Sequence, residues 1–231
     1  GVDFEVRPSE VVALMGDNGA GKSTLVKVLS GAIRPDAGTI TIAGEQVSFA
    51  TPIEARRAGI ETVYQDLSLA DTLDPAANLF LGRELRRRGV LGRLGFLDQR
   101  LMRQRTLEAF ESLRVTVPSV QAPVRDLSGG QRQGVAVARA VTWAKHVLFL
   151  DEPTAALGVQ QTRNVLDLIR RVRDRGVSVV LISHSVPDVM AVADRVEVLR
   201  LGRRVGQFVV ATSAAADIVS AIVGATDESD R

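Results

Sequence analysis

The 231-residue sequence contains no cysteine, which excludes disulfide bonds and thiolate metal sites. No apolar run approaches the roughly 18 residues that a membrane-spanning helix needs, and no signal peptide is evident. Hydrophobic residues make up 45% of the chain and charged residues 24%, ordinary values for a globular protein. We therefore expect a soluble, cytoplasmic chain with one sizeable core, or one core plus a subdomain.

Lysine is nearly absent, because Lys22, Lys27 and Lys145 are the only lysines among 29 basic residues. The formal net charge is only +2, and no basic patch is interleaved with aromatic residues as on a nucleic-acid-binding surface. We interpret the arginine excess as a bias of the source genome and expect no nucleic-acid partner. No stretch is repeated either, which argues against a solenoid.

One segment fits the phosphate-loop pattern G-x-x-x-x-G-K-S/T: Gly16, Asp17, Asn18, Gly19, Ala20, Gly21, Lys22, Ser23 and Thr24. Its glycines let the backbone turn N–H groups toward phosphate oxygens. Lys22 adds a positive charge for the β- and γ-phosphates, and the Ser23 hydroxyl is a Mg²⁺ ligand. A strand-like run over 11–15 and a helical apolar pattern from Leu25 favour a nucleotide site over a chance Gly-rich turn.

The remaining pattern alternates strands and helices, which predicts an α/β sandwich around a mainly parallel sheet. Buried strands are expected over 147–150 and 177–183, and a closing antiparallel hairpin around Gly202. A helix is expected to begin at Thr51, with a capping box to Glu54. Further strands are expected over 2–6, 39–42 and 60–64. Further helices are expected over 76–81, 97–113, 129–144, 160–175 and 214–223, and residues 227–231 are expected to fray.

Residues 72–145 read as a mainly helical subdomain, with Leu101, Leu107 and Phe110 on the apolar positions of its long helix. The arginine run at 86–88 is interpreted as a solvated loop, with an acidic partner or a lipid surface as alternatives.

Polar residues end several of the expected strands. Asp151 and Glu152 follow a buried run, where parallel sheets bind ligands. Beside a phosphate loop, Asp151 is a candidate Mg²⁺ ligand and Glu152 a candidate for polarising water, although both could instead cap a helix before Pro153. His184 ends another buried run and could donate to a γ-phosphate or hold the water or Glu152. Gln65 is a weaker candidate for ligating Mg²⁺ and orienting water.

A second candidate anion site is formed by Ser128, Gly129, Gly130 and Gln131 at a helix start. Ser-x-x-Gln is also an ordinary capping box. Paired glycines weaken a helix by roughly 1 kcal/mol each, which favours close approach of a ligand to the backbone. Because one phosphate loop is already present, this site would serve another nucleotide.

In their order along the chain, these segments resemble the motifs of the ATP-binding-cassette (ABC) ATPases. The matches are the Walker A loop at 16–24, the Q-loop at Gln65, the LSGGQ signature at 127–131, the Walker B motif at 147–152 and the switch histidine at His184. The resemblance implies a P-loop NTPase sandwich with a helical subdomain and a small antiparallel β portion. It also implies Mg²⁺-dependent ATP hydrolysis. Two cassettes would pair head to tail, as a homodimer or with another cassette, each signature closing on the partner's ATP.

Within that family the chain is similar to the ATP-binding subunits of bacterial sugar importers of the ribose/fructose type, through 51–55, 78–84, 152–158, 182–184 and 201–204. This narrower resemblance implies transmembrane permease partners, indirectly a periplasmic or extracellular sugar-binding protein, and a place at the cytoplasmic face of the membrane. Residues 1–231 would form one stand-alone cassette. An ABC exporter subunit, a soluble non-transport ABC ATPase and a small-molecule kinase are the alternatives.

Two features depart from the family pattern. Gly158 stands where the general family has aspartate after the Ala-Leu of its D-loop, which bears on communication between two ATP sites. The adenine-stacking aromatic belongs to an element before Val2, so we expect the first strand to be truncated, and Phe4 is a poor substitute. The transported sugar is not readable from the sequence.

Overall fold

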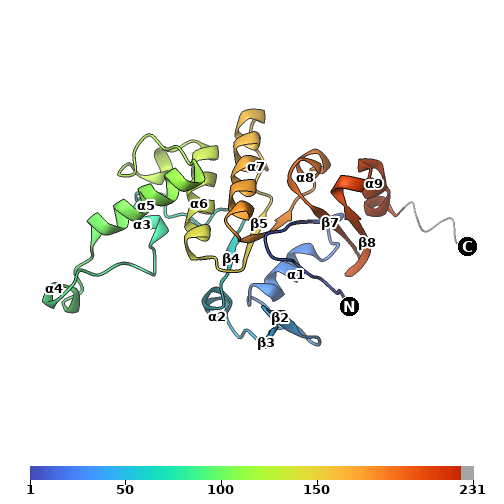
Figure 1. Ribbon diagram of the computed structural model, residues 1–231, viewed down its shortest axis with the longest axis horizontal. Helices are drawn as coiled ribbons and strands as arrows, with labels where there is room; N and C mark the ends of the chain where they lie inside the picture. The colour runs from blue at the N-terminus through green and yellow to red at the C-terminus, as the bar shows by residue number, and fades with distance from the viewer. Residues whose placement is uncertain (225–231) are drawn as a thin grey trace, which may run out of the picture.

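The computed structural model describes residues 1–224, and within them six strands form one sheet in the order β4-β5-β6-β1-β7-β8 (Figure 1). All neighbours in this sheet are parallel except β7 and β8, which form an antiparallel hairpin. The strands are β1 (Val11–Met15), β4 (Ile60–Val63), β5 (Val147–Asp151), β6 (Ser178–Ile182), β7 (Arg195–Arg200) and β8 (Arg203–Val209). The expected mainly parallel sheet is confirmed.

The central strands are apolar along their whole length because both faces of the sheet are covered. Every residue of β1 and β6 is buried. Successive residues point to opposite faces, so that Leu148 and Leu150 enter one core and Phe149 enters the other. The sheet therefore lies between two hydrophobic layers, and its strand ends are held rigidly.

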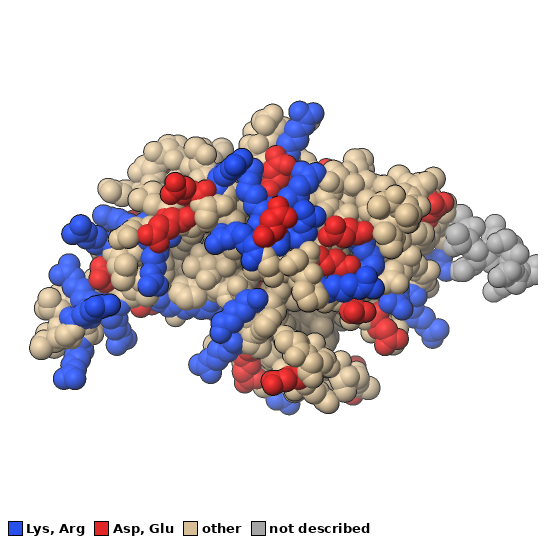
Figure 2. All heavy atoms as spheres, in the orientation of Figure 1, with Lys and Arg blue, Asp and Glu red and all other residues tan. Residues whose placement is uncertain are grey.

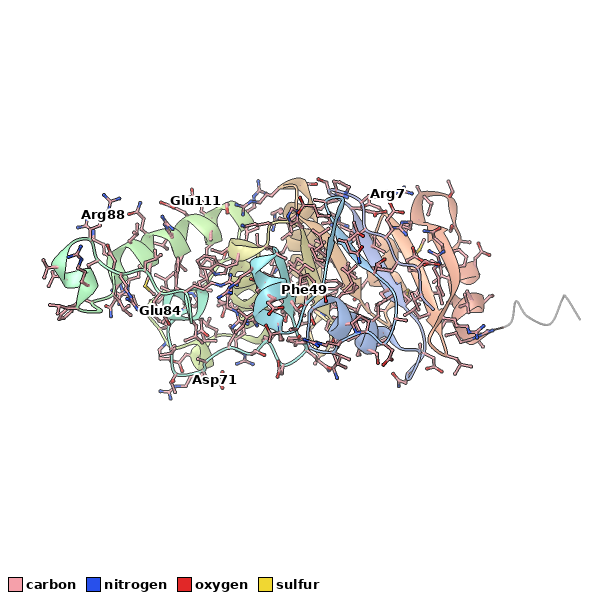
Figure 3. The ribbon with its side chains drawn as sticks, turned by 90° about the horizontal axis from the view of Figure 1, so that it is seen from below. Arg7, Phe49, Asp71, Glu84, Arg88 and Glu111 are labelled. Carbon is pink, nitrogen blue, oxygen red and sulfur yellow. The ribbon has the colours of Figure 1, made fainter. Side chains whose placement is uncertain are left out.

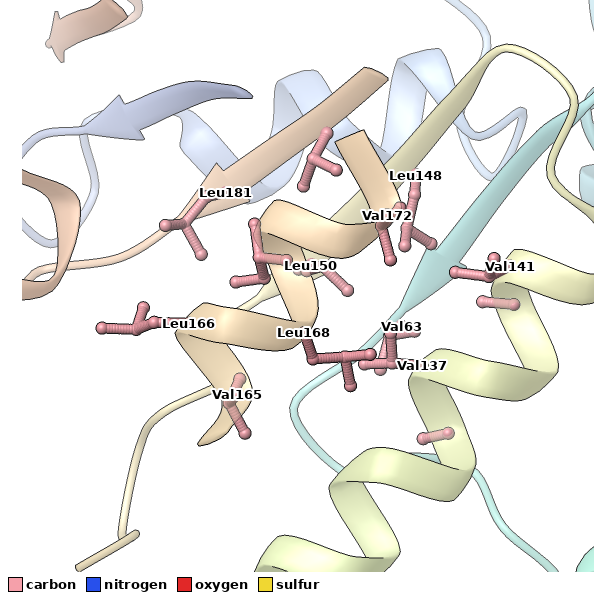
Figure 4. Packing of buried hydrophobic residues seen from close by; sticks show 14 of the residues in the cluster. Val63, Val137, Val141, Leu148, Leu150, Val165, Leu166, Leu168, Val172 and Leu181 are labelled. Carbon is pink, nitrogen blue, oxygen red and sulfur yellow. The ribbon is translucent and has the colours of Figure 1, made fainter. Parts of the chain in front are cut away.

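Helices cover both faces. The first core packs against α6 (Gly129–Trp143), α7 (Val159–Asp174), α8 (Val186–Val192) and α9 (Ala215–Val223), with Val137 and Val141 of α6 and Val165, Leu168 and Val172 of α7 meeting the strands (Figure 4). The second core packs against α1 (Lys22–Leu29) and α2 (Pro52–Arg57) through Val26 and Ala55.

The small antiparallel portion differs from expectation at two places. A short hairpin joins β2 (Ile40–Ile42) to β3 (Glu45–Val47), and β3 was not expected. The strand expected over 2–6 is wrong, since the structure assigns no strand there. Val2, Phe4 and Val6 nevertheless alternate with exposed neighbours and pack on the second core, which explains the strand-like pattern.

Three helices lie at one end of the molecule, away from β7 and β8: α3 (Pro75–Leu79), α4 (Val90–Arg93) and α5 (Gln99–Leu113) (Figure 1). The helix expected from 97 begins at Gln99 because the Asp98 side chain caps it, accepting from the Leu101 amide at 3.0 Å. Of the apolar positions expected on this helix, Phe110 is buried but Leu107 is 52% exposed, and the buried face is formed by Met102, Thr106, Phe110 and Leu113. Short 3₁₀ turns lie at Val124–Asp126 and Val210–Thr212.

The arginine run at 86–88 is exposed at this same end, where Figure 3 labels Arg88, and it leads into α4 through Gly89. Basic side chains are also prominent along α7, where acidic ones lie among them (Figure 2). No helix within residues 1–224 is long and apolar enough to span a membrane. The fraying expected over 227–231 falls outside the described residues.

Candidate functional site: a phosphate loop at the carboxyl edge of the sheet

The phosphate loop connects β1 directly to α1. Gly16 follows Met15 with a φ of 146°, and Gly21 caps α1 with a φ of 102°. A Cβ on Gly16 would lie 2.2 Å from the carbonyl oxygen of Leu199, so only glycine fits the start of the loop. Gly19 also has a positive φ of 80°, but nothing lies within 4 Å of its would-be Cβ.

These two glycines give a matched pair of substitutions. Gly19→Ala should cost only the positive-φ strain, about 1–2 kcal/mol. Gly16→Ala adds a clash with the backbone, and overpacking costs about 1–3 kcal/mol more. We expect Gly16→Ala to lower the melting temperature further than Gly19→Ala and to abolish ATP binding, as measured by thermal unfolding and isothermal titration. Equal effects of the two substitutions would contradict the role of the Leu199 contact.

The Lys22 ammonium lies over its own loop. Nζ donates to the carbonyl oxygens of Gly16 at 2.7 Å and Asp17 at 3.0 Å. The positive charge is thereby concentrated where the loop amides and the N-terminus of α1 already favour an anion.

The loop shares one cavity of about 400 Å³ with residues from two other strand ends. Gln65 follows β4, Asp151 ends β5 and Glu152 comes directly after it. The cavity is lined by Asn18, Gly19, Ala20, Gly21, Lys22, Ser23, Thr24, Gln65, Asp151, Glu152 and Ile182. Parallel strands bring their carboxyl ends to the same edge, which is why residues so far apart in sequence converge. Ser23, Gln65 and Asp151 contribute hydroxyl, amide and carboxylate oxygens, a donor set that fits Mg²⁺ beside a phosphate.

Burial and the nearby Glu152 carboxylate raise the pKa of Asp151, while Lys22 and Lys27 act in the opposite direction. A carboxyl group whose pKa is higher in the folded chain than in the unfolded chain destabilises the folded chain at pH values above the folded-state pKa. This destabilisation disappears at pH values below the unfolded-state pKa. We expect Asp151→Asn to raise the melting temperature of the nucleotide-free chain at pH 7, with a gain that shrinks as the pH falls toward 4. A gain that grew on acidification would contradict this account.

Glu152 is held in an unusual conformation beside His184. Its φ of 49° is rare for a residue other than glycine, and its amide donates to the Ile182 carbonyl at 3.0 Å. Its side chain is 17% exposed, and Oε1 lies 2.9 Å from Nδ1 of His184, which is 75% exposed. Such backbone strain is typical of functional sites. The structure thus brings the expected Glu152 and His184 together. Glu152 lines the phosphate-loop cavity and also, with His184, a neighbouring cavity of about 460 Å³.

Ser128, Gly129, Gly130 and Gln131 lie elsewhere. Ser128 caps α6, its Oγ accepting from the Gln131 amide at 3.3 Å while Gln131 Oε1 accepts from the Ser128 amide at 2.9 Å. A Cβ on Gly130 would lie 3.0 Å from the Gln161 side chain, so part of the need for glycine is packing against α7. Ser128, Gly130 and Gln131 line a separate cavity of about 430 Å³ beside α7. Within the described residues, one copy therefore does not bring its two candidate anion sites together.

Sequence reasoning missed one tie between the strand-end loops. The Thr154 hydroxyl donates to Asp188 at 2.8 Å, which connects the segment after Glu152 to α8 after His184. The pattern Ser-Val-Pro-Asp at 185–188, in which Ser185 caps α8 and accepts from the Asp188 amide, is the signal that would have located α8.

The profile of the ABC transporter family matches residues 1–155. The fructose import ATP-binding protein FrcA of Rhizobium meliloti is 50% identical, over 87% of this chain and 78% of the relative. The chain belongs to the ABC transporter family. This cassette is also 45% identical to the xylose/arabinose import ATP-binding protein XylG of Sulfolobus acidocaldarius, over 88% of the chain and 78% of the relative.

A ribose import ATP-binding protein of Rubrobacter xylanophilus is 44% identical over 99% of this cassette but only 44% of its own length, so the cassette spans less than half of that relative. Among solved structures, cbiO1 of Clostridium perfringens superposes with a TM-score of 0.77 at 24% identity, over 99% of this chain and 88% of that one. Dimeric MJ0796 bound to ADP and Pi superposes with a TM-score of 0.74 at 24% identity, over 90% and 89%. These likenesses confirm the cassette fold, and family membership makes this an ATP-binding ATPase.

Proposed function

We propose that this cassette hydrolyses ATP to drive import of a monosaccharide. The observation that carries the proposal is the single cavity in which the phosphate loop, Gln65, Asp151 and Glu152 converge, with His184 hydrogen-bonded to Glu152. The sugar is suggested by the relatives, whose names specify fructose, xylose/arabinose and ribose import. Those names favour an importer over the exporter and non-transport alternatives.

The binding roles follow from the donors in the cavity. The amides of the loop and the Lys22 ammonium hold the phosphates of ATP. Ser23, Gln65 and Asp151 would hold Mg²⁺, which supplies charge neutralisation at the β- and γ-phosphates when bound. Asp151 suits a cation because burial raises its pKa, and a bound cation would act in the opposite direction by stabilising the ionised carboxylate.

Glu152 is placed to act as the general base. As the water oxygen attacks the γ-phosphorus, the water proton passes to the Glu152 carboxylate, and the bond to the bridging oxygen breaks to give ADP and inorganic phosphate. His184 orients this base. Because an ionised carboxylate only accepts hydrogen bonds, Nδ1 of His184 carries the proton that it donates to Glu152. This contact favours holding Glu152 among the expected roles of His184.

The signature site is assigned to a second cassette. Ser128, Gly129, Gly130 and Gln131 stand at the N-terminus of a 15-residue helix, which favours an anion. Three of them, Ser128, Gly130 and Gln131, line a different cavity from that of their own phosphate loop. A head-to-tail pair, as a homodimer or with another cassette, would place this site on the partner's ATP. Permease subunits would join the pair at the cytoplasmic membrane face, and a sugar-binding protein would deliver the sugar to them. We further propose that 1–231 acts as one cassette whose helical subdomain spans about 72–145.

Reconstitution tests the transport function. The cassette is placed in vesicles with the proposed permease subunits and sugar-binding protein, and ATP-driven uptake of fructose, ribose and xylose is measured. We expect uptake of at least one sugar, and none with Glu152→Gln. ATP hydrolysis that proceeds without uptake of any of them, or that is stimulated by ribosomes instead, would contradict the proposed function.

A further inference from the structure

The turn that follows Gln65 is built in a conformation that its residues do not favour. Leu67 and Ser68 have φ values of 59° and 45°, so two consecutive non-glycine residues occupy the left-handed region. Local hydrogen bonds hold only part of the turn. The Leu67 amide donates to the Tyr64 carbonyl at 2.9 Å, and the Ser68 hydroxyl donates to the Asp66 carboxylate at 2.9 Å. Left-handed pairs of this kind persist where surrounding structure fixes them.

Arg139 supplies that fixation from a distant part of the chain. Its two terminal guanidinium nitrogens donate to the carbonyl oxygens of Ser68 at 2.6 Å and Leu67 at 2.8 Å. The planar fork of arginine suits two adjacent acceptors, and the side chain is half-buried, which limits its freedom to leave them. Arg139 belongs to α6, the helix that begins at the signature residues Gly129 and Gly130.

The surroundings only partly offset the cost of burying this charge. Arg139 lines a cavity of about 210 Å³ with Glu61 and Ser68. Burial and the like charge of Arg56 lower the pKa of Arg139, while the carboxylates of Glu61 and Asp66 act in the opposite direction. Glu61 is in turn paired with Arg83 at 2.8 Å. The Arg139 side chain thus extends from α6 toward Glu61 of β4 and toward the turn that follows Gln65, and Gln65 itself lines the phosphate-loop cavity.

We propose that Arg139 is a positioning residue for Gln65: it clamps the turn at Leu67 and Ser68 so that Gln65 faces the phosphate-loop cavity. The clamp makes the position of the signature helix and that of Gln65 interdependent within one copy. A shift of α6 is transmitted to Gln65 through two hydrogen bonds. The expected effect of Arg139 on ATP hydrolysis rests on the proposed function of Gln65, whereas the clamping of the turn by Arg139 does not depend on that function.

The clamp is tested directly by hydrogen exchange of the intact chain, comparing Arg139→Gln with the parent. We expect faster exchange in the segment 64–70 and unchanged protection of α6. Arg170→Gln is the matched control, because Arg170 also donates to a backbone carbonyl, that of Ala191 at 2.6 Å, and lines neither of the two cavities. Arg139→Lys, which keeps the charge and one set of donors, should lie between Arg139→Gln and the parent. Unchanged exchange over 64–70 in both Arg139 variants would overturn the proposal.

Kinetics test the link to Gln65. Arg139→Gln should lower kcat for ATP hydrolysis at least tenfold while KM for ATP changes less than twofold, since the phosphate loop is untouched. Arg139→Gln combined with Gln65→Ala should be no slower than Gln65→Ala alone, because both act through the same side chain. Losses that multiply in the double variant would assign Arg139 a separate role and overturn the proposal. If Gln65→Ala has full activity, the proposed function of Gln65 fails, and the exchange measurement still decides the clamp.

Discussion

Glu152→Gln is expected to bind ATP as the parent does and to hydrolyse it about 10²–10⁴-fold more slowly, the usual contribution of a general base. The amide keeps the shape of the side chain and retains an oxygen that accepts from His184, but it cannot take the proton of the attacking water. Binding is measured by titration with ATP, and turnover by phosphate release under saturating Mg²⁺ and ATP.

Glu84→Gln is the matched control for this change. Glu84 is exposed in the helical end of the molecule and accepts from the Gly82 amide at 2.9 Å, away from the phosphate loop. We expect it to keep the parental rate. A Glu152→Gln chain that turned over at the parental rate would remove Glu152 from the chemistry, and one that lost ATP affinity would assign it to binding instead.

Mixing two inactive variants is expected to restore hydrolysis. Lys22→Ala removes the phosphate-loop charge, and Ser128→Arg blocks the signature of the same chain. A mixed pair nevertheless contains one composite site with both parts intact. If the two sites of a pair act independently, an equimolar mixture should reach roughly a quarter of the parental rate when chains pair at random, and up to about half when only mixed pairs form, because each mixed pair has one working site.

The control mixture contains Lys22→Ala and the double variant Lys22→Ala/Ser128→Arg, in which no pair has an intact site. Activity is compared at several total concentrations, because a shared site also makes the rate of the parent rise more than linearly with concentration. A test mixture no more active than the control would contradict independent composite sites.

The parts of the fold that were predictable have strong local signals. The buried strands read as continuous apolar runs, and the phosphate loop is fixed by glycines and a lysine within one short segment. Strand ends then meet at one edge because the strands are parallel, so Gln65, Asp151 and Glu152 could be grouped before their distances were known. The grouping of these distant residues could be predicted from the parallel arrangement of the strands rather than from the chemistry of the side chains.

The errors arise where tertiary contacts decide. Val2, Phe4 and Val6 alternate with polar residues as in a strand, but their side chains pack on the second core and their backbone is not part of a described strand. Glu54, expected to close a capping box on Thr51, accepts from the Ala50 amide at 2.7 Å instead, so the helix start was right and its cap was wrong. Leu107 fits the helical period, yet 52% of it is exposed to solvent.

Contacts between distant segments were also out of reach. Arg139 meets Leu67 from 72 residues away, and the positive φ of Leu67 leaves no mark in the sequence. Thr154 and Asp188 likewise meet across the ends of two different strands. Side chains that position others are thus recognised only in the folded chain, whereas the side chains proposed to bind the nucleotide are located by motifs.

The central claim is that the signature of one cassette completes the ATP site of another, and the mass of the Glu152→Gln chain in solution tests it most directly. Light scattering is recorded without nucleotide and with saturating ATP, so that hydrolysis does not disperse the complex. We predict a shift from the 24.8 kDa chain to about twice that mass with ATP, and no shift when Ser128→Arg is added to the same variant. A Glu152→Gln chain that stays monomeric while fully loaded with ATP, or a Ser128→Arg double variant that pairs equally well, would contradict the account.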